Sequence, residues 1–300
     1  MLKFAVCELA RPLLVRLPAG SVRLLGLLGA ADHGDHSWLE HPRRIRVFWD
    51  RHINSWVKVD LADAGGRWHY FPGRYHDHCN QWLIRRVIRP GGWYVDIGAN
   101  VGIHTLLASR LAGASGRVLA VEPNPDTRRN LELHLALNDA TNVAVYPYAL
   151  GNGEGSIQLF TDPTFSAIAS VRSGDPGRLS IHVRLKRGDD LFPRPPRDAT
   201  CLVKIDVEGS ELEVIRGMDW WLGRPRTCFV IEITPSWIRQ LNGSAEELIG
   251  RFRQQGYACC VIARKSKLYR SAPTLTPIER PLDDQKDYLF FRAEERHLFS

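Results

Sequence analysis

The residues best suited to chemistry lie in a short glycine-rich turn. Residues 96–102 read Asp-Ile-Gly-Ala-Asn-Val-Gly, after an apolar run and before a helix-like one. Gly98 permits a tight turn and lets a ligand approach the backbone, while Gly102 lets the following helix pack closely. A dinucleotide fingerprint has glycine where Asp96 stands. An acid there favours a cationic, amino-bearing ligand such as S-adenosylmethionine, with Asn100 also in the binding turn.

A second acid follows at the end of the next apolar run. Residues 118–124 read Val-Leu-Ala-Val-Glu-Pro-Asn, and Glu122 closes the apolar part. In doubly wound folds an acid at this place accepts hydrogen bonds from both hydroxyls of a ribose. We therefore predict that Glu122 and the adjacent Asn124 bind the cofactor. Tyr148 and Ala149, at the end of the third strand, are expected where an adenine ring would lie.

A third acidic motif supplies the catalytic candidates. Residues 203–211 read Val-Lys-Ile-Asp-Val-Glu-Gly-Ser-Glu, and Asp206 should reach the edge of the sheet where ligands bind. Asp206 is the first candidate for a base or for an acceptor that orients a hydroxyl. Glu208 is a substrate candidate, although its charge would also suit the start of the next helix. His104 is the second catalytic candidate, and packing within its helix is the alternative.

Further polar residues could line the substrate entrance. Tyr75 begins the run Tyr-His-Asp-His, which is either part of that entrance or an ordinary polar loop. Glu232 ends the predicted strand beside that of Asp206, and it is a candidate for contact with substrate. Asp206 and Glu232 would also suit a shared Mg²⁺, because carboxylates are hard ligands. A reaction without metal is the favoured interpretation.

An alternation of strands and helices must position these residues. Seven strand-like runs are predicted, at residues 93–97, 117–121, 143–148, 202–206, 228–233, 257–262 and 288–291. Helical runs separate several of them, at residues 101–111, 126–137, 211–221 and 245–255. This pattern predicts an α/β fold with a doubly wound, mostly parallel, seven-stranded sheet covered on both faces. Residues 151–160 and 179–192 are expected to form a separate hairpin.

The region before this alternation is different. Strand-like runs at 45–49, 56–61 and 68–71, with a turn at 63–66, predict a small antiparallel meander, and a helix is expected at 78–88. We therefore divide the chain into a helical amphipathic segment at 1–32, a small β-rich extension with one helix at 33–90, and a cofactor-binding domain at 91–300.

The three acidic motifs together resemble those of the FkbM-type S-adenosylmethionine-dependent methyltransferases. Smaller similarities are Tyr75 before a Pro-Gly-Gly turn at 90–92, the Asp-Asp-Leu step at 189–191, and Ile231 with Glu232. The resemblance covers roughly residues 70–292. It implies a class I methyltransferase fold and, in most members, O-methylation of a hydroxyl on a sugar, glycan or secondary metabolite. The chain departs from the family at Gly188, where leucine is common.

Composition limits the partners. The 300 residues carry a net charge of +7, from 40 basic and 33 acidic residues, without a block of like charges. A nucleic-acid partner is therefore not expected, and a small-molecule or glycan acceptor is. The six cysteines show neither zinc-site nor disulfide spacing, which favours a reducing cytoplasm. No apolar run is long enough to span a membrane, and the interrupted N-terminus is not that of a signal peptide.

The first thirty residues leave two interpretations open. Leu2, Val6, Leu9, Leu13 and Leu17 fall on one helical face, and Pro12 predicts two short helices rather than one. This face would give weak peripheral contact with the inner surface of a membrane, or it would pack on the chain's own sheet or on a second subunit. The alternatives for the whole protein are a non-catalytic adenosine-binding scaffold and an NAD(P)-dependent oxidoreductase.

Overall fold

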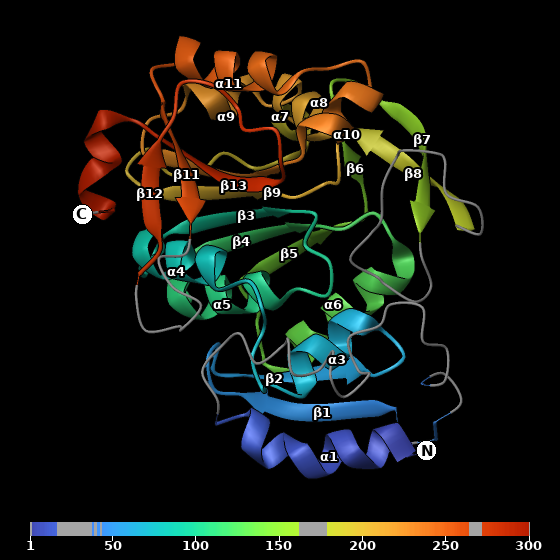
Figure 1. Cartoon of the computed structure of the whole chain (residues 1–300). Helices are drawn as coiled ribbons and strands as arrows, with labels where there is room; N and C mark the ends of the chain where they lie inside the picture. The colour runs from blue at the N-terminus through green and yellow to red at the C-terminus, as the bar shows by residue number, and fades with distance from the viewer. Residues whose placement is uncertain are drawn as a thin grey trace.

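A large mixed sheet crosses the middle of the molecule, and helices cover both of its faces (Figure 1). The computed structural model describes residues 2–16, 38, 41–42, 44–161, 179–263 and 272–299. Within these residues the sheet has eight strands in the order β12-β11-β13-β10-β9-β3-β4-β5. Their bounds are β3 Trp93–Ile97, β4 Arg117–Val121, β5 Val143–Tyr146, β9 Cys201–Ile205, β10 Thr227–Ile233, β11 Ala258–Ala263, β12 Thr274–Pro277 and β13 Lys286–Phe291.

The strand order confirms the predicted doubly wound α/β fold. Strands β5, β4, β3, β9 and β10 are parallel, and β13 lies antiparallel between β10 and β11. All seven predicted strands are present. The additional strand, β12, pairs with the edge of β11, and its four residues were too short and polar to predict. The chain builds outward from β3 on one side and from β9 on the other, so the order reverses between these two strands, where ligands bind in such folds.

Two apolar cores hold the helices on the sheet, because successive side chains of a strand point to opposite faces. Tyr94 and Leu202 lie in the core beneath α5, whereas Val95 and Val203 lie in the core that contains Phe252 of α11. The helices on the first face are α4 His78–Val87, α5 Ile103–Ala112 and α6 Pro125–Leu137. Those on the second face include α8 Glu211–Arg216, α9 Asp219–Gly223, α10 Pro235–Gln240 and α11 Ala245–Gln254.

The β-rich extension differs from its prediction at one element. Two strands, β1 (Ile45–Asp50) and β2 (Ser55–Asp60), pair antiparallel as expected, but residues 68–71 fall in helix α3 (Ala64–Tyr70) and its C-cap instead of a third strand. The Asp63 side chain caps this helix by accepting a hydrogen bond from the Gly65 amide at 2.8 Å. A Cβ on Gly66 would lie 2.2 Å from the Asp60 carbonyl oxygen. The glycines that suggested a turn are therefore needed for close helix–strand contact.

The predicted helix at 211–221 is two helices, because the chain bends at Gly217. A Cβ on Gly217 would lie 2.1 Å from the carbonyl oxygen of Gly151, so α8 ends where the neighbouring hairpin approaches. That hairpin forms a separate three-stranded sheet in the order β6-β8-β7, as the described residues show it. The bounds are β6 Ala149–Leu150, β7 Gly155–Thr161 and β8 Leu179–Lys186, followed by α7 Gly188–Leu191, where strand was predicted. The chain ends near a 3₁₀ helix, η2 Ala293–Leu298.

In the described part of the N-terminal segment, residues 2–16, helix α1 (Leu2–Leu14) continues through Pro12, so the predicted break at Pro12 is wrong. Pro12 has no amide hydrogen and therefore removes one intrahelical hydrogen bond. Tertiary contacts compensate for the lost bond. The Arg11 guanidinium donates to the Tyr70 backbone carbonyl and lies 4.1 Å from the centroid of the Tyr70 ring.

The face of α1 that packs on the protein is not the predicted apolar face. Cys7 and Leu14 are buried, whereas Val6, Leu9 and Leu13 are 40%, 82% and 64% exposed. Leu17 and the Leu2 side chain lie outside the described residues. None of the helices that the structure describes is long and apolar enough to cross a membrane.

Candidate active site

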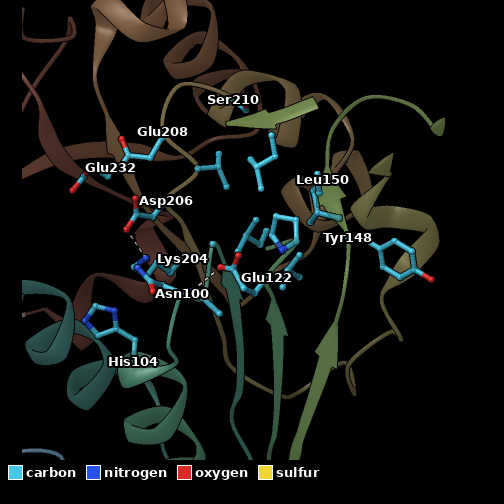
Figure 2. A pocket seen from close by; sticks show the side chains of 18 of the residues that line it. Asn100, His104, Glu122, Tyr148, Leu150, Lys204, Asp206, Glu208, Ser210 and Glu232 are labelled. Atoms are coloured by element: carbon cyan, nitrogen blue, oxygen red, sulfur yellow. Dashed lines mark hydrogen bonds and ion pairs between the residues drawn. The ribbon is translucent and has the colours of Figure 1, made fainter. Parts of the chain in front are cut away.

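A cavity of about 690 Å³ opens at the carboxyl ends of β3, β4 and β9. It brings together all the predicted site residues except Asp96 and Asn124. One end carries the acidic side chains that follow β9 and that of Glu232 near the end of β10, and Tyr148 and Leu150 lie at the other (Figure 2). The predicted convergence of residues from distant parts of the chain is therefore a feature of the structure.

The glycine turn connects the two ends of this cavity. Gly98 has φ +77°, and a Cβ there would lie 1.9 Å from the Asp206 carbonyl oxygen, so β3 and β9 touch through its bare backbone. Gly102 has φ +84°, and a Cβ there would lie 2.2 Å from Leu131 of α6. Both positions therefore require glycine, one for strand contact and the other for helix packing.

Glu122 is fixed by backbone donors. Its Oε2 accepts from the Asn100 amide and its Oε1 from the Asn124 amide, each at 2.9 Å. Asn100 reaches this position with φ +49°, a left-handed conformation that asparagine tolerates better than most residues. Burial raises the pKa of Glu122 to about 7 despite these bonds. Each oxygen keeps a further lone pair with which it can accept from a ligand hydroxyl.

Two of the predicted cofactor residues support the site from behind. Asn124 accepts from the Asp126 amide at 3.1 Å and so caps α6. Asp96 is 1% exposed, and its Oδ2 accepts from the Thr105 hydroxyl at 2.6 Å. Neither lines the cavity. Asp96 precedes the last residue of β3, and its side chain points toward α5 rather than outward from the strand end.

Lys204 is a site residue that the sequence reasoning missed. It is 4% exposed, and its Nζ lies 2.9 Å from Asp206 Oδ2 and 3.9 Å from Asp96 Oδ1. Burial alone would lower the pKa of Lys204, but the two carboxylates outweigh it and hold the pKa above its ordinary value. A charged residue inside a strand that is buried throughout was the available signal, because a buried charge needs a partner.

Carboxyl groups crowd the end of the cavity beyond Asp206. Ligand oxygens of Asp206, Glu208 and Glu232 lie within 4.8 Å of one another, so the two predicted metal ligands are neighbours and Glu208 joins them. Burial, with the charges of Asp206 and Asp287, raises the pKa of Glu232 to about 9. Burial and nearby acids likewise raise the pKa of Asp287 to about 7. Glu232 therefore retains its proton at neutral pH.

The opposite end of the cavity is largely apolar. Tyr148 and Ala149 line it as predicted, and the Arg184 guanidinium lies 4.8 Å from the Tyr148 ring centroid. Apolar side chains from the hairpin sheet complete the wall, namely Leu150, Ile157, Leu159 and Leu185. This end offers a flat, apolar surface for a ring such as adenine.

His104 and Tyr75 meet at the acidic end. The two rings contact edge to face, with centroids 5.4 Å apart. His104 Nε2 lies 3.3 Å from Asp77 Oδ2, an acid that the sequence analysis considered only as part of the Tyr-His-Asp-His run. Both His104 and Tyr75 line the cavity, so the extension before the sheet contributes directly to the site.

A family model described as the Methyltransferase FkbM domain matches residues 96–259, which is more than half of the chain. The chain belongs to the FkbM methyltransferase family. This confirms the predicted resemblance. The match begins at Asp96 in β3 and ends in β11, so Tyr75 and Asp77 precede it and Asp287 follows it.

Curated relatives of this FkbM methyltransferase carry methyltransferase names. The hexuronic acid methyltransferase AglP of Haloferax volcanii is 34% identical over 125 residues, covering 41% of this chain and 48% of the relative. Methyltransferase 1 of Beauveria bassiana is 28% identical over 144 residues, covering 42% of this chain and 57% of the relative. The matches thus span about half the length of these relatives. A solved methyltransferase FkbM from Methylobacillus flagellatus aligns with 15% identity and a TM-score of 0.43, covering 75% of this chain and 54% of that one.

Proposed function

We propose that this FkbM methyltransferase uses S-adenosylmethionine to methylate a hydroxyl of a sugar, a glycan or a secondary metabolite. The observation that carries the proposal is the position of Glu122. Its carboxyl group lies at the end of β4 in the cavity, beside the glycine turn of β3, and is held by two backbone amides. An acid at this place in a doubly wound sheet suits the two hydroxyls of an adenosine ribose.

The rest of the cavity fits the same cofactor. Glu122 would bind the ribose, the backbone of the turn at Gly98 would approach the amino-acid portion, and the surface around Tyr148 and Ala149 would cover the adenine. When bound, S-adenosylmethionine supplies a methyl group on a positively charged sulfur. The acidic end of the cavity favours a positive charge nearby, because carboxylates at short range attract a cation in a partly desolvated site.

The acceptor would enter at the acidic end. Five carboxyl groups line this end, those of Asp77, Asp206, Glu208, Glu232 and Asp287. An anionic group on the acceptor would be repelled by the carboxylates at this end, so we propose a neutral, hydroxyl-bearing acceptor. In this respect the acceptor would differ from the hexuronic acid in the name of the relative AglP.

The protein's own residues would act mainly by alignment. Oriented reactants gain about 7–11 kcal/mol over free ones in favourable cases, whereas a general base contributes about 10²–10⁴-fold. Asp206 can accept a hydrogen bond from the acceptor hydroxyl while Lys204 neutralises its charge at 2.9 Å. Because Lys204 already supplies positive charge at this carboxylate, we propose a reaction without Mg²⁺.

Calorimetry with S-adenosylhomocysteine tests the proposal. Replacement of the buried Glu122 by alanine removes two charge-assisted bonds to the ribose, so Glu122→Ala should weaken binding by about 2–4 kcal/mol. That is a ~30- to 1000-fold rise in Kd. Glu246→Ala, at an exposed position in α11, is the matched control and should leave Kd unchanged. Equal affinity of the folded Glu122→Ala variant and the wild type, or preferential binding of NAD, would refute the proposal.

A further inference from the structure

We propose that Asp77 is a positioning residue that holds His104 as the general base for the acceptor hydroxyl. The inference rests on the proposed methyl transfer. In that step the acceptor oxygen bonds to the methyl carbon, and the carbon–sulfur bond breaks with its electron pair left on sulfur. The hydroxyl proton passes to Nδ1 of His104, which becomes an imidazolium. Asp77 precedes the residues matched by the family model.

Asp77 is held in place by the start of helix α4. Its Oδ1 accepts from the Asn80 backbone amide at 3.1 Å, and its Oδ2 accepts from the Asn80 side-chain amide at 2.7 Å. The same Oδ2 lies 3.3 Å from His104 Nε2. Asp77 therefore has little freedom to turn away from the histidine, because both of its oxygens are engaged.

The charge of Asp77 determines which nitrogen of His104 carries the proton. Burial alone would raise the pKa of Asp77, but the His104 charge and the two Asn80 bonds lower it overall. An ionised carboxylate only accepts hydrogen bonds, so the Asp77 carboxylate 3.3 Å away favours the tautomer of neutral His104 that carries its proton on Nε2, an atom that has no hydrogen-bond partner among the described residues. Nδ1 then keeps its lone pair, and it makes no hydrogen bond to any residue that the structure describes, although the side chain lines the cavity.

The surroundings of Asp206 and His104 give these two residues different roles. Asp206 is paired with Lys204 at 2.9 Å, which leaves it suited to orienting the hydroxyl. The Tyr75 ring packs edge-on against the imidazole, and His104 is only 6% exposed. Other ionisable groups near the histidine are Tyr94 and Asp96 on β3, His76 before α4, and Lys204 and Asp206 on and after β9.

The Asp77→Asn variant should reverse the tautomer of His104. Asparagine caps helices as well as aspartate, so its Oδ1 should keep the bond from the Asn80 amide. Its Nδ2 then replaces Oδ2 opposite His104 and, as a donor, requires a lone pair on Nε2. The proton of the neutral imidazole must therefore move to Nδ1, and the lone pair on Nδ1 is lost.

¹⁵N NMR of histidine-labelled protein measures this directly. Spectra are taken at about pH 8.5, two units above the ordinary histidine pKa of ~6.5, with the His104 signals assigned by His104→Gln. The wild type should show a protonated Nε2 and an unprotonated Nδ1, and Asp77→Asn the reverse. Asp63→Asn is the matched control, because Asp63 likewise caps a helix, α3, and it should leave the wild-type tautomer.

Three results would overturn the inference: a wild-type Nδ1–H tautomer, a His104 that is still protonated at this pH, or an unchanged tautomer in folded Asp77→Asn. None of these readouts requires cofactor or acceptor. Calorimetry of Asp77→Asn with S-adenosylhomocysteine should give wild-type affinity. Failure of the cofactor assignment therefore remains distinguishable from failure of the Asp77 inference.

Discussion

Two regions of the cavity, Glu122 and the acidic end, hold their carboxyl groups in opposite ways. Glu122 is separate from the acidic cluster, and two backbone amides hold it in place. At the acidic end Asp206, Glu208 and Glu232 lie within 4.8 Å of one another, so they compete for protons and for Lys204. Backbone donors fix Glu122 in one geometry, whereas the charge of the acidic end depends on pH and on what enters it.

The difference also follows the limits of the family match. Glu122 and its two backbone donors lie within residues 96–259. The acidic end adds Asp77 from before the match and Asp287 from after it. The proposed cofactor site is therefore built from the part of the chain that the family model matches, while the proposed acceptor site also uses residues outside that part.

Substitution of Gly98 should disturb both regions of the cavity and cause the largest loss in the free energy of unfolding. Gly98→Ala would be strained by its φ of +77° and would place Cβ 1.9 Å from the Asp206 carbonyl oxygen. Backbone strain costs about 1–3 kcal/mol and overpacking about 1–3 kcal/mol or more, together about 6 kcal/mol at the upper limit. Urea unfolding measures the loss. Gly113→Ala has φ +64° but nothing within 4 Å, so it should lose only about 1–2 kcal/mol. Equal losses would show that the contact between β3 and β9 is unimportant.

Removal of Lys204 should disturb the acidic end alone. Lys204→Met leaves the buried Asp96 without its cation. It also leaves the charge of Asp206, within the acidic cluster, without a neutralising partner. Breaking a buried ion pair costs about 3–5 kcal/mol. The control is Lys186→Met, which breaks the exposed pair with Glu154 and should cost about 0–1 kcal/mol. If chemical denaturation finds the two variants equally stable, Lys204 does not hold the acidic end together.

The last prediction concerns the pH dependence of stability due to Glu232. Its pKa rises from an ordinary 4.5 to about 9 in the folded protein, so the native state binds more protons than the unfolded state between these values. The free energy of unfolding must then fall as the pH rises across this range. Glu232→Gln should unfold near the wild-type temperature at about pH 4.5 and at a higher temperature than wild type at about pH 9. Glu154→Gln, on an exposed side chain, should match the wild type at both. A Glu232→Gln variant that gains nothing at high pH would contradict the crowding of these carboxyl groups.

The glycine turn and Glu122 were readable from sequence because their signals are local. A strand, a glycine turn and a helix follow one another at residues 93–112, and Glu122 ends the next strand. The seven predicted strands stand out for the same reason, since each is a short apolar run with turn residues beside it. Lys204, which the sequence analysis missed, also had a local signal, because it is a charged residue within a fully buried strand.

The acidic end was only partly readable because long-range contacts assemble it. Asp77 meets His104 from the start of α4, and Asp287 reaches Asn80 across more than two hundred residues. No spacing in the sequence reports such contacts. The misread helix α3 has a related cause, because its helical spacing of buried Arg67 and Tyr70 was hidden by an aromatic run that is typical of strands.

The reactivity of the six cysteines can report local and global unfolding of the molecule. All six are buried, and none forms a disulfide. Burial raises the pKa of Cys201 and Cys259 to about 12, and the thiolate is the form that reacts with labelling reagents. Modification therefore has to wait for the surrounding structure to separate. Cys7 lies on α1 and the four cysteines at 201, 228, 259 and 260 lie in the central sheet, so the order in which these thiols react with an alkylating reagent distinguishes release of the N-terminal helix from global unfolding.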